Sequence, residues 1–270
     1  MNSKIKLLIT GYDGYIGKNF VKFLKGKNIK FEKLDLKKTK NYKNFTHLLH
    51  LQFFIEEKRI NLKKNISNMN KIIKICQFNK LFLIFPSTAS FNFKGKKKIN
   101  NNINIINYYT MAKSECEKRI IAKNKSGELN YTILRIFNVY GETIKNKYYI
   151  SKLIKIFKEA KKFERIKIKF SENVRDYIHI SDLNSLFLKV IRKKQKGIFE
   201  VGSGRSLTIK SLSNKINDLF DKKNALIFIN PKKSPKNFYS KSNITNTKKV
   251  FKWMPQIKLL NGLRQLIFKS

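Results

Sequence analysis

The chain has 270 residues, of which 41 % are apolar, so it is long enough for one large domain, or for a larger domain with a smaller lobe, around a sizeable core. No apolar run approaches the roughly 18–20 residues that cross a bilayer, and the start lacks the apolar stretch and cleavage site of a secretory signal. We therefore expect a cytoplasmic protein that does not bind membranes. The 60 Lys and Arg residues outnumber the 17 Asp and Glu residues, which gives a formal net charge of +43. Because the lysines are spread over the whole chain, we interpret this charge as compositional rather than as a specific nucleic-acid site.

Strands and helices alternate in the first half of the chain. Apolar, strand-like runs are followed by stretches with apolar residues at helical spacing, and glycine or proline marks several of the ends. We predict strands at 5–10, 29–35, 46–51, 81–85 and 131–137, and helices at 15–24, 56–78 and 108–123. This alternation is typical of a parallel sheet with helices on both faces. The fold class we expect is therefore α/β, with a Rossmann-type doubly wound sheet.

The rhythm changes beyond Gly141. We predict a helix at about 149–161, a strand at 166–170, a helix at 181–192, a strand at 197–201, and a mixed segment at 205–270 that ends in a helix. From this pattern we expect a core formed by 1–141 and 176–201, and a small C-terminal lobe formed by 142–175 and 202–270. The Lys- and Asn-rich residues 94–107 are low in complexity and are predicted to form a loop.

Three glycines, Gly11, Gly14 and Gly17, lie between the first predicted strand and the first predicted helix. In that context glycines let the backbone turn tightly and approach a pyrophosphate closely, and the free N–H groups at the helix start attract its charge. The plainer interpretation is an ordinary strand–turn–helix connection. We favour the first interpretation and expect a dinucleotide site.

Asp35 ends the second predicted strand, where a carboxylate can accept hydrogen bonds from the adenosine ribose. Such a carboxylate would repel a 2′-phosphate, so it favours NAD over NADP. Lys37 and Lys38 follow and can receive that phosphate, which keeps NADP open. A strand-end turn or a helix cap is the plainer role for Asp35.

Tyr109 and Lys113 are four residues apart in a predicted helix and therefore share one face. An ammonium group near a phenol stabilises phenolate and lowers the pKa of the tyrosine, so the pair can move a proton to or from a sugar hydroxyl or carbonyl. The pattern alone is weak in a chain rich in Tyr and Lys. Its position supports it, because the helix follows the strand that ends at Pro86-Ser87-Thr88-Ala89-Ser90, where a hydroxyl can bond the same substrate oxygen.

Several further motifs occur in an order that resembles one family, the extended short-chain dehydrogenase/reductases, in the group of nucleotide-sugar epimerases, dehydratases and reductases. These motifs are His50-Leu51-Gln52, Asn65, Arg135-Ile-Phe137-Asn138-Val-Tyr140-Gly141, Val174-Arg175-Asp176-Tyr177-Ile-His179-Ile-Ser-Asp182, Phe199-Glu-Val-Gly202-Ser-Gly204, Trp253-Met-Pro255 and Leu260-Asn-Gly262-Leu263. The resemblance covers nearly the whole chain. It implies an NAD-binding core and a lobe that binds a nucleotide sugar.

The resemblance also implies residue roles. Tyr109 would be the acid/base, Lys113 would tune it, and Thr88 would be the hydroxyl partner. The cofactor would be held by Gly11, Gly14, Tyr15, Ile16, Gly17, Asp35, Leu36, Leu51, Asn65, Phe137, Tyr109 and Lys113. The substrate would be held by Thr88, Asn138 and Arg175; a guanidinium suits a diphosphate because its fork meets phosphate oxygens in pairs. A structural salt bridge with Asp176 is the plainer role for Arg175.

The sequence departs from the family pattern in three places. Only 14 residues separate Asp35 from His50, where the family usually fits another strand and helix. The family's Val-Tyr-Gly is Phe91-Asn92-Phe93 here. The Asp-Glu pair that 4,6-dehydratases carry after the catalytic Thr is replaced by Ala89-Ser90, so we reject the dehydratase interpretation.

We therefore predict hydride transfer at a sugar carbon, C4, of a nucleotide-diphosphate hexose. The sequence leaves an epimerase and a 4-ketoreductase open, and a homodimer is a further expectation. A non-catalytic dinucleotide or polyanion sensor on the same scaffold is the alternative, motivated by the charge and by the short 35–50 segment. We interpret His47, His50 and His179 as packing or hydrogen-bonding residues rather than metal ligands, and Cys76 and Cys116 as reduced, buried thiols.

Overall fold

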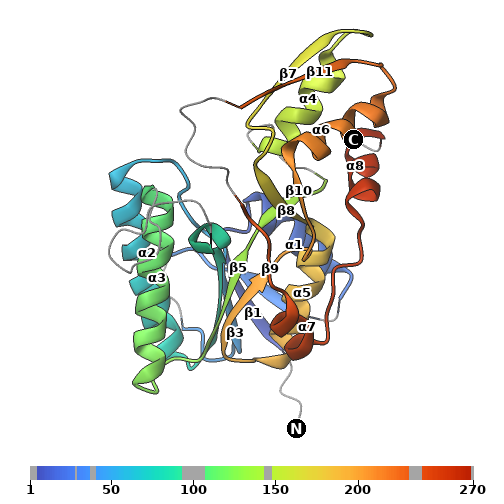
Figure 1. The fold of residues 1–270 in the computed structure, drawn as a ribbon. Coiled ribbons are helices and arrows are strands. Elements are labelled where there is room, and N and C mark those ends of the chain that lie inside the picture. Colours follow the sequence, from blue (N-terminus) through green and yellow to red (C-terminus); the bar gives the residue numbers. More distant parts are fainter. Residues whose placement is uncertain are drawn as a thin grey trace.

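The computed structural model describes residues 5–27, 29–36, 41–92, 107–142, 148–230 and 239–268. Figure 1 shows a layered α/β body with a smaller lobe above it. Of the predicted loop at 94–107, only Asn107 lies within the described residues.

The body is built on one six-stranded parallel sheet in the order β2-β1-β3-β4-β5-β9. The strands are β1 (Lys6–Thr10), β2 (Lys30–Lys33), β3 (His47–His50), β4 (Phe82–Thr88), β5 (Tyr131–Ile136) and β9 (Gly197–Val201). The inner strands are buried on both faces, which is why they form continuous apolar runs in the sequence. The predicted fold class, a Rossmann-type doubly wound sheet, is confirmed.

Strand β4 runs further than the sequence suggested. The prediction that Pro86 stops this strand at residue 85 was wrong. β3 pairs with β4 only as far as Ile84, whereas β5 pairs with it as far as Thr88. No residue of β3 pairs with Pro86, so the missing N–H group of the proline leaves no hydrogen bond between these strands unmade. The extension carries Thr88 to the carboxyl edge of the sheet.

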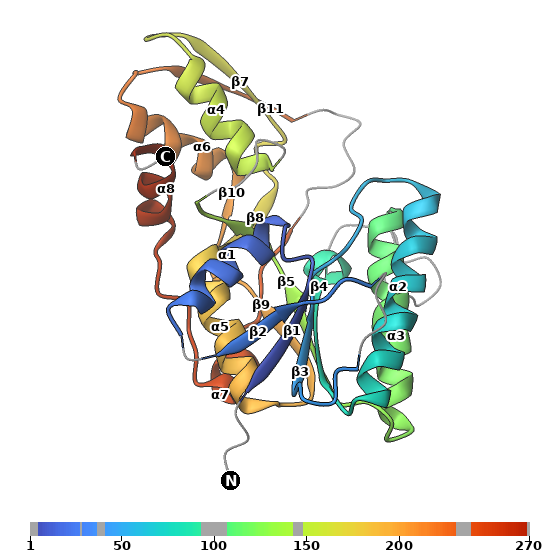
Figure 2. The same ribbon diagram turned by 180° about the vertical axis from the view of Figure 1, so that it is seen from behind.

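Helices cover both faces of the sheet (Figures 1 and 2). On one face lie α1 (Tyr15–Lys25), α5 (Ile180–Lys193) and α7 (Thr245–Phe251), and on the other lie α2 (Arg59–Phe78) and α3 (Tyr108–Lys125). A buried apolar cluster fills each interface. In the first, the rings of Phe20 and Phe187 meet edge to face at 5.2 Å. None of the described helices is long and apolar enough to span a membrane.

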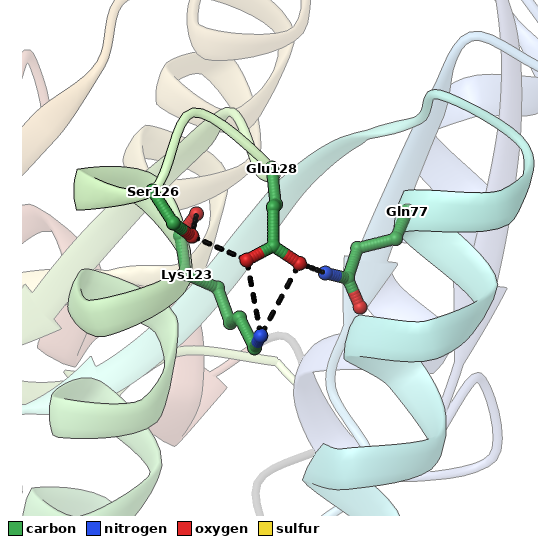
Figure 3. A network of polar contacts seen from close by, with 4 residues as sticks. All are labelled: Gln77, Lys123, Ser126 and Glu128. Atoms are coloured by element: carbon green, nitrogen blue, oxygen red, sulfur yellow. Dashed lines mark hydrogen bonds and ion pairs between the residues drawn. The ribbon is translucent and has the colours of Figure 1, made fainter.

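One carboxylate joins the ends of α2 and α3 (Figure 3). Glu128 accepts hydrogen bonds of 2.5 Å from both Gln77 Nε2 and Ser126 Oγ, and Lys123 Nζ lies 3.1 Å from it. These partners, Ser126 foremost, hold the pKa of Glu128 below its usual value. Because the network is exposed, it orients the helix ends and adds little stability.

The short connection between β2 and β3 leaves the sheet without a further strand on that side in the part of the chain that the structure describes. Among the residues described between them, 34–36 and 41–46, there is no further strand or helix. β2 is therefore the outermost strand of the described sheet on this side. The shortening that the sequence indicated is confirmed.

In the described part of the chain, the smaller lobe contains two short sheets and three helices. One sheet has the order β10-β8-β6, and in the other β11 lies beside β7. The elements are β6 (Asn138–Tyr140), α4 (Tyr149–Glu159), β7 (Arg165–Lys169), β8 (Val174–His179), β10 (Ser206–Thr208), α6 (Ile209–Phe220), β11 (Ala225–Ile229) and α8 (Leu259–Phe268). They enclose a third apolar cluster. The terminal helix was predicted and is confirmed, whereas β8 and α6 were not predicted; the boundaries proposed between core and lobe stay a prediction.

The segment around Trp253 ties the end of the chain to α5. Trp253 Nε1 donates to Ser185 Oγ at 2.8 Å. The backbone N–H groups of Gln256 and Ile257 donate to the carboxylate of Asp182 at 2.9 and 3.1 Å. These contacts give the Trp-Met-Pro motif a structural role, because they fix where the chain leaves the body and enters α8.

Candidate active site

Two of the three motif glycines are required by close contacts. Gly11 has a φ of +66°, and a Cβ there would lie 2.4 Å from the backbone N of Gln52. A Cβ on Gly17 would lie 2.2 Å from the carbonyl oxygen of Gly11. Gly14 caps α1 and donates its N–H to the same oxygen at 3.1 Å. The loop can therefore fold tightly against α1, and it leaves the helix start open to an anion.

The residues predicted to hold the adenosine half of a cofactor lie around this loop. Ile16 and Leu51 pack, partly buried, against the apolar cluster beside α1, and Leu36 packs against the cluster beside α2. Asp35 is exposed just beyond the end of β2. The two lysines that follow Leu36 lie outside the described residues, so the preference for NAD stays a prediction.

Tyrosines connect the glycine loop with the predicted acid/base. Tyr15 is the first residue of α1, and its ring lies 5.8 Å from that of Tyr148. Tyr148 in turn acts electrostatically on Tyr109. The glycine loop and the start of α3 therefore face the same region at the carboxyl ends of the strands, which is where ligands of doubly wound sheets bind.

The structure places Tyr109 and Lys113 one turn apart at the start of α3. Asn107 caps this helix, because its side chain accepts a 2.8 Å hydrogen bond from Thr110 N. Lys113 is buried, and its Nζ donates to the carbonyl oxygen of Pro86 at 2.6 Å. Thr88 is also buried and exchanges hydrogen bonds with Ser90, with its Oγ1 donating to Ser90 Oγ at 2.9 Å.

Burial controls the protonation of this pair. It raises the pKa of Tyr109 to about 12, against the lowering effect of hydrogen bonding with the Thr88 side chain. It lowers the pKa of Lys113 to about 7. The sequence predicted that the ammonium lowers the pKa of Tyr109; in this structure burial outweighs any such effect. The reason is geometric, since Lys113 Nζ points to Pro86 and lies 5.9 Å from the centre of the Tyr109 ring.

Phe53 belongs to this site and was missed from the sequence. Its ring centre lies 3.7 Å from Lys113 Nζ, and its ring meets that of Tyr109 at 5.6 Å and 88°. The sequence carries one indication of this position. Phe53 directly follows His50-Leu51-Gln52, and β3 ends at His50, so Phe53 lies near the carboxyl edge of the sheet.

Asn65 acts on the loop that carries Phe53. Its Oδ1 accepts from the backbone N of Phe54, and its Nδ2 donates to the carbonyl of the same residue, both at 2.9 Å. The buried amide is thus committed to the 51–58 loop. The predicted cofactor role of Asn65 stays a prediction, and the structure shows that its side chain fixes the backbone next to Phe53.

Three predicted site residues lie where the body meets the smaller lobe: Phe137, predicted to contact the cofactor, and Asn138 and Arg175, predicted to hold the substrate. Phe137 is buried and donates its backbone N–H to the carbonyl of Val201 at 2.9 Å. Asn138 Nδ2 donates to the backbone oxygen of Asp176 at 2.8 Å. Arg175 on β8 is partly buried and acts electrostatically on the phenol of Tyr149.

The carboxylate of Asp176 is the centre of a buried hydrogen-bond network. Its fully buried carboxylate accepts hydrogen bonds from the backbone N and the hydroxyl of both Ser203 and Ser242, at 2.6–3.1 Å, and from Gly204 N at 3.1 Å. These donors join two turns of the chain. The network gives Asp176 a structural role of its own, because its carboxylate links these two turns to β8.

All three histidines are buried, and the interpretation that they pack or form hydrogen bonds rather than bind a metal stays a prediction. Burial lowers the pKa of both His47 and His50 to about 3, so both are neutral near pH 7. His50 Nδ1 lies 2.7 Å from Thr10 Oγ1. The described part of the chain holds no group of three or more His, Cys, Asp or Glu side chains that could bind a metal ion. Cys76 and Cys116 are buried and unpaired with each other.

Comparison with known proteins identifies related chains. The model of the NAD dependent epimerase/dehydratase family matches residues 50–202. GDP-6-deoxy-D-talose 4-dehydrogenase of Aggregatibacter actinomycetemcomitans is 26 % identical over 213 residues, 70 % of this chain and 71 % of the relative. dTDP-4-dehydro-6-deoxyglucose reductase of Escherichia coli is 29 % identical over 248 residues, 84 % of this chain and 74 % of the relative. The UDP-glucose 4-epimerase of Thermotoga maritima, solved with UDP-glucose, has a TM-score of 0.81 at 20 % identity, covering 98 % of this chain and 99 % of that one. This last likeness shows the fold.

Proposed function

Because the chain belongs to the NAD dependent epimerase/dehydratase family, we propose that this NAD(P)-dependent enzyme moves a hydride between its cofactor and C4 of a nucleotide-diphosphate hexose. Family membership confirms the predicted enzyme class and nicotinamide cofactor. The observation that carries the finer proposal is the grouping of Thr88, Tyr109 and Lys113 at the carboxyl edge of the sheet.

The glycine loop fits a dinucleotide. The spaces that a Cβ on Gly11 or Gly17 would fill are taken up by backbone, so the loop lies close enough to α1 for its N–H groups to meet a pyrophosphate. Asp35 would accept hydrogen bonds from the adenosine ribose, and Lys113 would hold the nicotinamide ribose. When bound, the nicotinamide supplies or accepts the hydride.

Tyr109 would move the proton that accompanies the hydride. In ketone reduction the hydride adds to C4, and the Tyr109 phenol gives its proton to the former carbonyl oxygen. A pKa of about 12 keeps this phenol protonated in the free enzyme near pH 7, which is the form that reduction needs. Thr88 would donate a second hydrogen bond to that oxygen, and the ammonium of Lys113 would balance the phenolate that remains.

The direction we favour is reduction of a 4-keto sugar. The protonated phenol supports it, and both curated relatives are named for redox chemistry at position 4. An epimerase would instead return the hydride to the opposite face of the same ketone. A dehydratase is not proposed, because Ala89 and Ser90 supply no carboxyl group for water elimination.

The diphosphate of the substrate would lie between the body and the smaller lobe. Arg175 is suited to it because its planar fork can donate two parallel hydrogen bonds to phosphate oxygens. Asn138 lies on the neighbouring strand β6 and orients the backbone of β8 at Asp176. The net charge of +43 would raise the local concentration of any such dianion.

A substrate panel tests the proposal. Purified protein is mixed with NADH or NADPH and with dTDP-, GDP- and UDP-linked 4-keto and 4-hydroxy hexoses, while cofactor absorbance and sugar products are followed. We expect stoichiometric NADH oxidation with a 4-keto sugar, and weaker use of NADPH because of Asp35. Interconversion of two 4-hydroxy sugars without net cofactor consumption would identify an epimerase. Cofactor binding with no turnover across the panel would contradict the proposal and favour a sensor.

A further inference from the structure

Phe53 lies between the two residues to which the proposed function assigns proton transfer. Its ring centre is 3.7 Å from Lys113 Nζ, and its ring is perpendicular to that of Tyr109. Phe85 presents a second ring whose centre is 4.5 Å from the same nitrogen. The ammonium therefore meets one carbonyl oxygen, that of Pro86, and aromatic faces in a site where Lys113 keeps only 5 % of its surface exposed.

A cation held against aromatic faces away from water is attracted by their negative charge density, at about 0.5 kcal/mol in exposed sites and about 2 kcal/mol in desolvated ones. This attraction opposes the burial that drives Lys113 toward its neutral form. The loop that carries Phe53 is fixed in position, because the Asn65 side chain bonds both backbone groups of Phe54. We propose that Phe53 is a positioning residue whose ring holds the Lys113 ammonium beside Tyr109 and keeps it charged. The catalytic consequence rests on the proposed function, whereas the contact itself does not.

The contact can be tested by changing the pH, because the groups around Lys113 are not expected to change charge near neutral pH. Among the described residues, the titratable or charged groups that face Lys113 are His50 on β3, Tyr109, Cys116 and Glu117 on α3, and Arg135 on β5 through Glu117. Burial keeps the pKa of His50 at about 3 and raises those of Tyr109 and Cys116 to about 12. Glu117 is paired with Arg135 at 2.7 Å. Lys113, whose pKa burial lowers to about 7, is the group we expect to change charge near neutral pH.

A double-mutant cycle tests the contact without cofactor or substrate. Phe53→Leu keeps an apolar cover but removes the ring, and Lys113→Met removes the ammonium but keeps much of the stem. Urea unfolding of the full chain is measured for wild type, both single variants and the double variant at about pH 6 and about pH 9.5. We expect a coupling of about 2- to 30-fold in the unfolding equilibrium constant at the lower pH, where the lysine is charged, and almost none at the higher pH.

Matched variants separate the ring from packing. Phe53→Tyr should restore the coupling, because it keeps the aromatic face. Phe78→Leu, at an exposed ring at the end of α2, should show no coupling with Lys113→Met. Coupling that is equal at both pH values would show ordinary packing and overturn the proposal, as would the absence of coupling at both.

The pH–rate profile tests the catalytic consequence. If turnover requires the ammonium, its alkaline limb follows the pKa of Lys113. Phe53→Leu should then move that limb to lower pH by about 0.4–1.5 units, while Phe53→Tyr leaves it in place. An unmoved limb with an active Phe53→Leu enzyme would overturn this consequence. If no nucleotide sugar turns over, the proposed function fails, and the unfolding cycle still decides the contact.

Discussion

At the scale of single residues, burial of the Lys113 ammonium lowers the free energy of unfolding of the chain. Its folded pKa, about 7, lies below the usual value of 10.5, so between these values the unfolded chain binds more protons than the folded one. Wild-type stability should therefore rise as the pH rises through this window, and the full cost is present below pH 7. We predict that Lys113→Met unfolds at higher urea concentration than wild type at about pH 6, and that this advantage shrinks toward pH 10. Urea titrations across the pH range measure it.

The same substitution should impair function, because it removes a proposed ribose contact and the charge beside Tyr109. Greater stability together with weaker cofactor binding and lower turnover would mark Lys113 as a residue kept for function. Lys118→Met, at an exposed lysine of the same helix, is the control and should show no such pH dependence. A Lys113→Met protein that is less stable than wild type at pH 6 would show that the cation–π and carbonyl contacts outweigh burial.

Spacing predicted that Tyr109 and Lys113 share a helix face, and the family resemblance selected Thr88 among the hydroxyls at the strand end. Both predictions were possible because helical periodicity and strand ends are local properties. The protonation of the tyrosine was not predictable, since it depends on burial by distant segments. Phe53 was missed for the same reason: its ring faces Lys113 because Asn65, 12 positions later, holds the neighbouring backbone. The order of residues along the chain does not show that contact.

At the scale of elements, the β1–α1 connection depends on contacts between backbone atoms. A methyl group on Gly17 would overlap the Gly11 carbonyl and would lie 2.7 Å from Tyr12 Cα, so Gly17→Ala must displace the loop. We predict a loss of NAD(H) affinity of roughly tenfold or more, since about 1.4 kcal/mol of overlap is enough for that. Calorimetric titration measures it. Gly26→Ala is the control, because the nearest atom to its Cβ is 4.0 Å away, and full affinity in Gly17→Ala would contradict the role of the loop.

Elements of the body were easier to predict than those of the smaller lobe. The central strands are buried on both faces, so their apolar runs identified them. The end of β4 was mistaken, and α7, which also covers the body, was not predicted. The extension of β4 is possible because β3 stops pairing with β4 at Ile84, whereas β5 pairs with it as far as Thr88. This difference depends on the neighbouring strands and not on the residues of β4. β8 was missed because Val174–His179 includes Arg175, Asp176 and His179, and its burial depends on β10 and β6.

At the scale of the whole molecule, the charge of +43 predicts weak attraction to any polyanion. Binding to duplex DNA should be independent of sequence and should fall steeply as salt rises, because it arises from counterion release. Fluorescence anisotropy with two unrelated duplexes at several salt concentrations measures it. Tight binding that distinguishes the duplexes at about 150 mM salt would point to a nucleic-acid function instead.

The overall topology was predictable because alternation of strands and helices determines a parallel sheet. The short 35–50 connection also indicated a shortened sheet edge, and the residues described there, 34–36 and 41–46, contain no further strand or helix. How the body and the smaller lobe are joined was not predictable, since that depends on buried polar networks such as the one around Asp176. Five donors from two turns meet its carboxylate, and they come from residues 27–66 positions later in the chain.

The central claim is that Tyr109 moves the proton that accompanies hydride transfer. Tyr109→Phe keeps the ring and its contact with Phe53 but removes the hydroxyl. With the most active 4-keto nucleotide sugar and saturating cofactor, we predict that kcat falls by roughly 10²–10⁴-fold, the usual contribution of general acid–base catalysis, while NAD(H) affinity and stability stay close to wild type. A Tyr109→Phe enzyme that keeps the full wild-type kcat would contradict the account.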